Sequence, residues 1–202
     1  MKKAQLPPGR MAHIRRTTAL YNMVPNLTWT ILHLAPVTVF CFTWMRPLWV
    51  YVLLVAALLV ALLPAIVYRK MQLGAEVAVY KRIGIMWVRR FSQDGDIINR
   101  LLRKRFPGYK VIHEPAGVRR YILRANMNER FHCGLFAFMT GIMVFAVVQA
   151  HYIWALVIAI NNVLYNLYPM FLQQYNRIRL REISHHREGF DMFMRKERIG
   201  LY

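Results

Sequence analysis

The sequence predicts an all-α membrane protein with four transmembrane helices, arranged as two hairpins with a basic amphipathic cytoplasmic segment between them. Hydrophobic residues make up 57% of the 202 residues and charged residues only 18%, yet Lys and Arg number 28 against 9 Asp and Glu. Soluble domains have about 45–50% apolar and about 25% charged residues. A chain that is both apolar and strongly cationic is typical of a membrane protein whose positive charge lies on one side of the bilayer. This composition excludes a soluble enzyme.

The first predicted hairpin joins residues 27–45 and 48–68, which are uncharged runs of 19 and 21 residues. Each run is close to the roughly 20 residues that a helix needs to cross the hydrocarbon core. Only Arg46 and Pro47 separate them. Because proline cannot continue a helix, we expect a tight turn at this point.

The second predicted hairpin joins residues 131–148 and 152–172 through a turn at 149–151. The later of the two runs has 21 residues without a charge, which again suffices to cross a bilayer. Tryptophan is enriched where helices meet the membrane surface. Three tryptophans lie beside the two predicted turns: Trp44, Trp49 and Trp154.

The distribution of Lys and Arg predicts the orientation. Five lie in residues 1–25, fifteen in 69–130 and seven in 173–202, so 27 of the 28 lie outside the two turns. Cytoplasmic loops carry the excess of these residues in membrane proteins. We therefore expect one multi-pass membrane domain over residues 1–202, with both termini, the middle segment and the basic tail in the cytoplasm.

The cytoplasmic middle mixes apolar and basic positions. Residues 69–92 have the pattern of an amphipathic helix that lies among lipid headgroups. Asp96 is a candidate N-cap for a short helix over residues 97–106, which Pro107 and Gly108 would end. Residues 109–112 and 118–123 are candidates for two short strands.

Two interpretations of the fifteen cations in this segment stay open. They are explained by topology together with attraction to anionic lipid headgroups, or they form a docking surface for an anionic cosubstrate such as an acyl-CoA or an acidic carrier protein. No nucleic-acid-binding motif accompanies them, so nucleic acid is not an expected partner.

Polar residues inside a predicted span are costly and need a reason. The third span opens with Glu129 and His132, three residues apart and therefore on one helical face. Both this pair and the end of the fourth span can be placed by their distance from the turn at 149–151, at 1.5 Å of helical rise per residue. Their predicted depths in the membrane differ by only about 7.5 Å. That exit and the span before it carry polar residues near one predicted face: Asn162, Asn166, Gln173 and Arg177.

The Glu-x-x-His spacing has three interpretations. Di-iron helix bundles need two such pairs and further carboxylates, which this sequence does not place near a span, so we expect no metal. As a dyad, Glu129 would orient His132, which would deprotonate a hydroxyl group. As a structural pair, the two residues would only satisfy backbone and interface polar groups, and the asparagines would only hold neighbouring helices together.

The same segments resemble the glycosyl-4,4'-diaponeurosporenoate acyltransferase family, membrane proteins that add a fatty acyl group to glycosylated carotenoids. The resemblance rests on Glu129-Arg130-Phe131-His132 at the start of a span and on the run from Asn166 to Leu180. This run reads Asn-x-x-Pro, then Gln-x-Tyr-Asn-Arg-x-Arg-Leu, with Gln174 where the family has Arg. His186 and Asp191 also match the H-x4-D pattern of glycerolipid acyltransferases, but a 30-residue tail cannot supply their α/β domain, and we interpret this match as coincidence.

The resemblance implies a multi-pass enzyme of the bacterial cytoplasmic membrane that acylates a hydroxyl group of a membrane glycolipid. The acyl donor would be an acyl-CoA or an acyl carrier protein, and no bound cofactor is expected. His132 would be the general base and Glu129 its orienting partner, Asn176 or Gln173 would stabilise the oxyanion, and Arg177 and Arg179 would hold the donor. The remaining candidate substrate-binding residues are Asn162, Asn166 and Tyr175.

A non-enzymatic protein is the alternative, a four-span assembly or lipid-binding partner whose polar row docks another membrane protein. The two hypotheses differ in one structural feature. An enzyme should have a cavity lined by Glu129, His132 and Asn176, whereas a structural partner should pack these groups shut.

Overall fold

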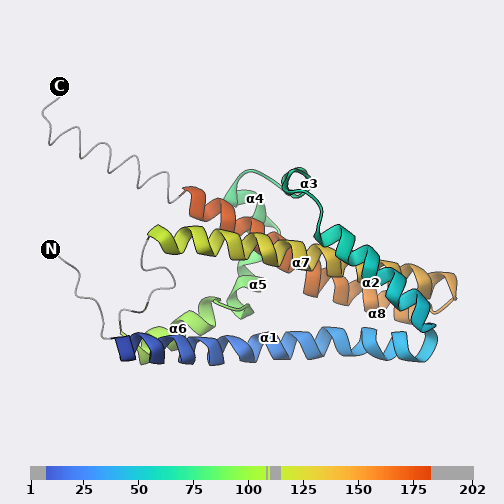
Figure 1. Cartoon of the computed structure of the whole chain (residues 1–202), viewed down its shortest axis with the longest axis horizontal. Helices are drawn as coiled ribbons and strands as arrows, with labels where there is room; N and C mark the ends of the chain where they lie inside the picture. Colours follow the sequence, from blue (N-terminus) through green and yellow to red (C-terminus); the bar gives the residue numbers. More distant parts are fainter. Residues whose placement is uncertain (1–7, 108, 110–114, 183–202) are drawn as a thin grey trace, which may run out of the picture.

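The computed structural model describes residues 8–107, 109 and 115–182, and this part of the chain is all-α, as predicted (Figure 1). A helical stretch over residues 168–182, here called the 168–182 helix, follows the last assigned element. The elements in order are α1 (Pro8–Trp44), α2 (Pro47–Ala61), α3 (Ala65–Lys70), α4 (Val77–Arg82), α5 (Ile85–Phe91), α6 (Asp96–Arg105), α7 (Pro115–Val148), α8 (Tyr152–Asn162) and the π-helical turn η1 (Val163–Leu167).

Three helices in the described chain are long and apolar enough to cross a membrane, where four spans were predicted. They are α1, α7 and the continuous helix that runs from Tyr152 to Glu182. The predicted span 48–68 is divided, because α2 ends at Ala61 and Pro64 interrupts the helix before α3 begins. At 1.5 Å per residue, the 15 residues of α2 extend about 22 Å, less than the roughly 30 Å hydrocarbon core.

The two predicted turns are present and lie at the same end of the molecule. α1 ends at Trp44, α2 begins at Pro47, and α7 and α8 are separated by residues 149–151. The rings of Trp44 and His151, one from each turn region, have centroids 4.2 Å apart. Figure 1 shows that α2 leaves α1 at this end and runs across α7 instead of returning along α1.

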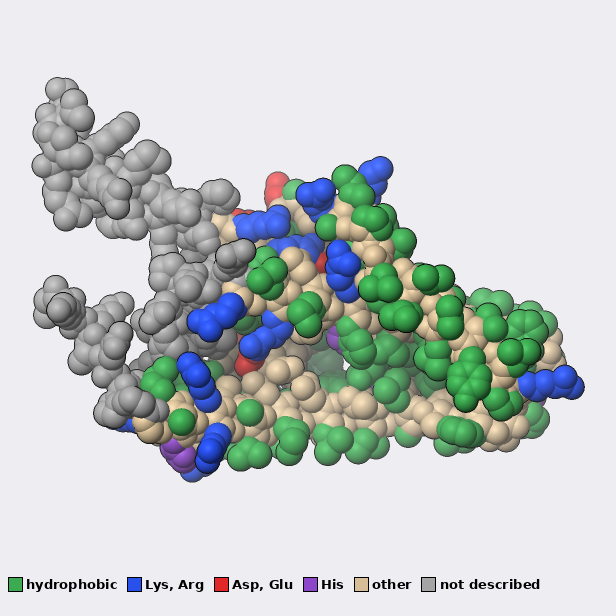
Figure 2. Space-filling view, in the orientation of Figure 1, with side chains coloured by type: hydrophobic (Ala, Val, Ile, Leu, Met, Phe, Trp, Pro, Cys, Tyr) green, Lys and Arg blue, Asp and Glu red, His purple; other side chains and the backbone are tan. Residues whose placement is uncertain are grey.

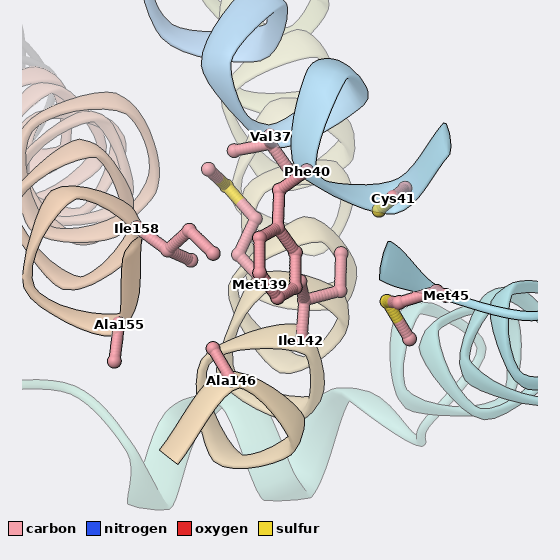
Figure 3. Close-up of a cluster of buried hydrophobic side chains, with 9 residues drawn as sticks. All are labelled: Val37, Phe40, Cys41, Met45, Met139, Ile142, Ala146, Ala155 and Ile158. Atoms are coloured by element: carbon pink, nitrogen blue, oxygen red, sulfur yellow. The ribbon is translucent and has the colours of Figure 1, made fainter. Parts of the chain in front are cut away.

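The apolar core near these turns joins three helices. Phe40 of α1 is fully buried against Met139 and Ile142 of α7 and Ile158 of α8 (Figure 3). α2 approaches α7 closely at Gly134, where a Cβ atom would lie 2.8 Å from the carbonyl oxygen of Ala57. Small residues permit such close approach of membrane helices, so α2 is held by α7 although none of its own residues is buried.

The surface divides into an apolar end and a cationic end (Figure 2). Large apolar side chains of α1 and α8 are exposed, with Phe42 87% and Ile153 80% accessible. Arg46 is the only Lys or Arg between residues 17 and 68. An exposed apolar surface of this extent is expected for contact with lipid. The orientation of the two ends across the membrane stays a prediction.

The segment between the two predicted hairpins differs from the prediction in three respects. Residues 69–92 form separate short helices, because Gly84 has a positive φ of 78° between α4 and α5. The helix expected over 97–106 is present as α6, but Gly95 is its N-cap and Asp96 pairs with Arg89 at 2.7 Å. The predicted strand over 118–123 is wrong, because these residues continue the helix of α7. Most of the predicted strand over 109–112, and both His186 and Asp191, lie outside the described residues.

Candidate functional site

A cavity of about 380 Å³ lies between α1, α5, α7 and the 168–182 helix. Figure 2 shows a recess between α1 and the rest of the bundle. Three of the predicted site residues line the cavity: His132, Gln173 and Asn176. The wall also carries aromatic and polar side chains from other elements, including Asn26, Trp29, Thr30, Trp87, Tyr121, Arg124 and Tyr165.

His132 is held by a chain of asparagine side chains in the fourth predicted span. Its Nδ1 lies 3.4 Å from Oδ1 of Asn166. The Asn166 amide donates to Oδ1 of Asn162 at 2.8 Å, and the Asn162 amide donates to the carbonyl of Phe136 and the hydroxyl of Thr140. Each amide therefore turns its N–H groups away from His132 and its oxygen toward it. The chain presents an acceptor to Nδ1, a contact that suits a ring with its proton on Nδ1.

A π-helical turn positions the same residues. The N–H of Tyr168 bonds to the carbonyl of Val163, five residues earlier. Pro169 has no N–H to offer the carbonyl of Tyr165, four residues before it. The His132 ring lies beside this turn, with its centroid 5.9 Å from that of the Tyr165 ring. π-helical turns are often found at functional sites.

The π-turn also changes which side chains face α7. An i→i+5 turn contains an extra residue compared with an α-helix, so the buried face advances by one position after it. Gln174, which is fully buried, continues the face of Asn162 and Asn166, where the uninterrupted period predicted Gln173. Gln173 therefore lines the cavity, as does Asn176 one turn later.

Glu129 contacts Gln174 and Arg177, so the predicted convergence of the two segments is confirmed while the expected bond from Glu129 to His132 is not. The Glu129 carboxylate accepts from Nε2 of Gln174 at 2.8 Å and forms an ion pair with Arg177. Glu129 is only 2% and Arg177 only 5% exposed. Arg177 donates further to Oδ1 of Asn126 at 2.8 Å. This pair is packed behind the cavity wall, and neither side chain lines the cavity.

The buried pair is connected to the segment that follows α3. Oε1 of Gln174 accepts from the hydroxyl of Tyr80 at 3.0 Å and from the backbone N–H of Leu73 at 3.2 Å. Tyr80 is fully buried, and this burial raises the pKa of its hydroxyl. The network therefore joins α7, the 168–182 helix and α4 into one unit.

Tyr175 and Arg179 complete the predicted set. Tyr175 is 2% exposed, and its hydroxyl accepts from Arg89 at 3.3 Å. Burial lowers the pKa of Arg89, but the contacts with the Asp96 carboxylate and the Tyr175 hydroxyl together outweigh it, and the pKa is raised overall. Tyr175 thus supports α5 from behind the cavity, while Arg179 is exposed on the 168–182 helix. The described residues contain no cluster of His, Cys, Asp and Glu placed to hold a metal ion.

The sequence profile of one family matches residues 64–186, more than half of the chain. The chain belongs to the glycosyl-4,4'-diaponeurosporenoate acyltransferase family. This family is one of acyltransferases in the carotenoid pathway, and the long apolar helices agree with a membrane protein. The matched region contains His132 and its supporting residues, whereas α1 and α2 lie outside it. No curated protein and no solved structure shows significant similarity to the chain.

Proposed function

We propose that this acyltransferase moves a fatty acyl group from a thioester donor, an acyl-CoA or an acyl carrier protein, to a sugar hydroxyl group of a membrane glycolipid. The acceptor that the family suggests is a glycosylated carotenoid. The observation that carries the proposal is the position of His132, which lines the cavity and is held from behind by the asparagine chain. With its proton on Nδ1, the ring would accept a proton at Nε2.

The reaction follows from this arrangement. The acceptor hydroxyl gives its proton to His132 while its oxygen attacks the thioester carbonyl, and negative charge develops on the carbonyl oxygen. Amide N–H groups of Gln173 and Asn176, both on the cavity wall, would stabilise that oxyanion. The carbon–sulfur bond then breaks, and the leaving thiolate takes the proton from His132, which yields the ester and the free thiol.

Arginines other than Arg177 are available to bind the donor. Arg177 is committed to Glu129. Arg124 lines the cavity, its side chain is 61% exposed, and its contact with Asp94 is long at 3.5 Å. Arg179 is exposed as well. Both guanidinium groups can bind a phosphate of coenzyme A or of a carrier-linked phosphopantetheine.

The cavity favours the enzyme over the non-enzymatic alternative. Two of the three side chains expected at an enzyme cavity, His132 and Asn176, line it, and the third, Glu129, is packed behind the wall. A docking surface for another membrane protein would have no need for an aromatic and amide-lined cavity around a histidine.

Lipid analysis of a deletion strain tests the function. Removal of the gene should cause a non-acylated glycolipid to accumulate at the expense of its acyl ester, as seen by liquid chromatography and mass spectrometry of pigments and lipids. The wild-type gene should restore the ester, and a gene encoding His132→Ala should not. An unchanged lipid and pigment profile in the deletion strain would argue against acyl transfer.

Replacement of Asn166 tests the asparagine chain separately from substrate binding. Asn166 is fully buried and does not line the cavity. In Asn166→Ala the tautomer and orientation of His132 are no longer fixed, so we expect kcat to fall about a hundredfold with little change in KM. Asn161→Ala is the matched control, because Asn161 bonds to His33 instead, at 2.6 Å. Equal kcat in the two variants would contradict a positioning role for Asn166.

A further inference from the structure

The middle of α1 crosses the cavity between two apolar anchors. At the start of the helix, Ile14 and Tyr21 pack against the α6 cluster around Leu102. Near the end, Val37 and Phe40 are buried against α7 and α8. Between these anchors, the helix faces the cavity with polar and aromatic side chains.

Three side chains on one face of this stretch bind the turn between α5 and α6. Trp29 donates its indole N–H to the carbonyl of Phe91 at 3.2 Å, and Asn26 donates to the side chain of Gln93 at 3.1 Å. Asn22, one turn earlier, binds Asp94. The spacing of 22, 26 and 29 is that of a single helical face, so the whole middle of α1 is aligned along this turn.

Asp94 is the centre of the contact. Its carboxylate accepts from Asn22 at 2.7 Å, and its backbone N–H donates to Oδ1 of Asn22 at 2.9 Å. Asn99 binds the Asp94 carbonyl at 2.7 Å, and Arg124 approaches the second carboxylate oxygen. Asp94 has a φ of 53°, a conformation that a non-glycine residue keeps when its surroundings hold it there. The turn is therefore a fixed support for α1.

The same stretch of α1 forms a wall of the cavity. Asn26, Trp29 and Thr30 line it from α1, and His132 lines it from α7. The Trp29 indole stacks on His33 with ring centroids 5.1 Å apart, and Thr30 shares a hydrogen bond of 2.9 Å with the hydroxyl of Tyr165. Because the indole N–H is already used by Phe91, Trp29 can offer a ligand only its apolar surface.

We propose that the middle of α1, held by the α5–α6 turn, is the wall that recognises the sugar ring of the acceptor, with Trp29 stacking on the ring and Asn26 and Thr30 binding its hydroxyl groups. An aromatic face combined with amide and hydroxyl groups suits a ligand that has both C–H faces and hydroxyl groups. This proposal rests on the proposed function. It also assigns acceptor choice to a helix that lies outside the matched family region, while the reacting histidine lies inside it.

Binding of octyl β-glucoside tests the wall. The full-length protein in lipid nanodiscs is titrated with radiolabelled octyl β-glucoside below its micellar concentration, and 1-octanol serves as the probe without a sugar ring. Trp29→Ala should weaken binding of the glucoside at least tenfold and leave octanol unchanged. Phe42→Ala is the matched control, since Phe42 is another α1 aromatic that is 87% exposed and outside the cavity lining, and it should leave both probes unchanged. Equal glucoside affinity in wild type and Trp29→Ala overturns the proposal, as does an equal loss for both probes.

Exchange of the side chains at positions 22 and 94 tests whether the α5–α6 turn holds α1 in place. Asn22→Asp sets two carboxylates against each other and should weaken glucoside binding, whereas Asn22→Asp combined with Asp94→Asn restores a donor–acceptor pair and should restore binding. If the double variant binds the glucoside no better than Asn22→Asp, the turn does not have the proposed role.

Acyl transfer from lauroyl-CoA, measured on the same samples, separates the proposed function from the proposed role of α1. If the glucoside binds in a Trp29-dependent way but receives no acyl group, the enzymatic function is wrong and the role of α1 in binding stands. If the glucoside is acylated and its affinity is the same in wild type and Trp29→Ala, the role of Trp29 is wrong and the enzymatic function stands.

Discussion

Replacement of His132 by alanine should reduce acyl transfer about 10²- to 10⁴-fold, the usual contribution of a general base. The imidazole lies on the cavity wall and is held from behind by the asparagine chain. The variant should still insert and fold, because the buried ion pair of Glu129 and Arg177 does not involve this ring. Initial rates per folded molecule, with lauroyl-CoA as donor, measure the effect.

His151→Ala is the matched control for this loss. His151 also packs against aromatic side chains, those of Trp44 and Phe40, but it lies in the turn at 149–151 and does not line the cavity. Its removal should leave the rate per folded molecule close to that of the wild type. If His132→Ala keeps more than a tenth of the wild-type rate, the assignment of His132 as general base is wrong.

Local rules predicted the depth at which the site residues meet. The turn at 149–151 and the helical rise per residue are set by nearby sequence, and together they brought Glu129 to the level of Gln174 and Arg177. The facing of Gln173 was not predicted correctly, because the period was counted through the π-turn, whereas Asn162, Asn166 and Arg177 are buried as expected. Pro169 was the available signal, since it cannot donate to the carbonyl of Tyr165 and thereby favours an irregular turn.

The number of long helices was overestimated for a similar reason. The run over residues 48–68 is apolar throughout, but Pro64 lies within it and ends the continuous helix. The opposite error was made in α7, where the strand predicted over 118–123 is an extension of the helix. Apolar composition identifies segments that avoid water, whereas proline and tertiary contacts decide how far each helix continues.

The α1 wall could not be predicted because its contacts join distant parts of the sequence. Asn22 and Asp94 are 72 residues apart, and Thr30 and Tyr165 are 135 apart. The polar and aromatic residues at 22, 26 and 29 do share a helical face, which marks that face as different from the lipid-facing one. No local pattern indicates which turn or helix they meet.

Replacement of Arg177 by methionine should destabilise the fold by about 3–5 kcal/mol, the usual cost of leaving one member of a buried ion pair unpaired. Glu129 would keep its bond from Gln174 but lose its charge partner at 2% exposure. Arg124→Met is the matched control. Its ion pair with Asp94 is long and its side chain is 61% exposed, so its loss should cost less than about 1 kcal/mol.

Unfolding titrations in detergent micelles, together with rates per folded molecule, distinguish the structural role of Arg177 from a role in donor binding. Because methionine fills much of the same volume without a charge, the expected loss for Arg177→Met is in stability, and the surviving folded protein should keep its KM for lauroyl-CoA. Glu129→Gln with Arg177→Met removes both charges and should recover part of the stability lost in Arg177→Met. If Arg177→Met instead has wild-type stability and a strongly raised KM for lauroyl-CoA, Arg177 contacts the donor.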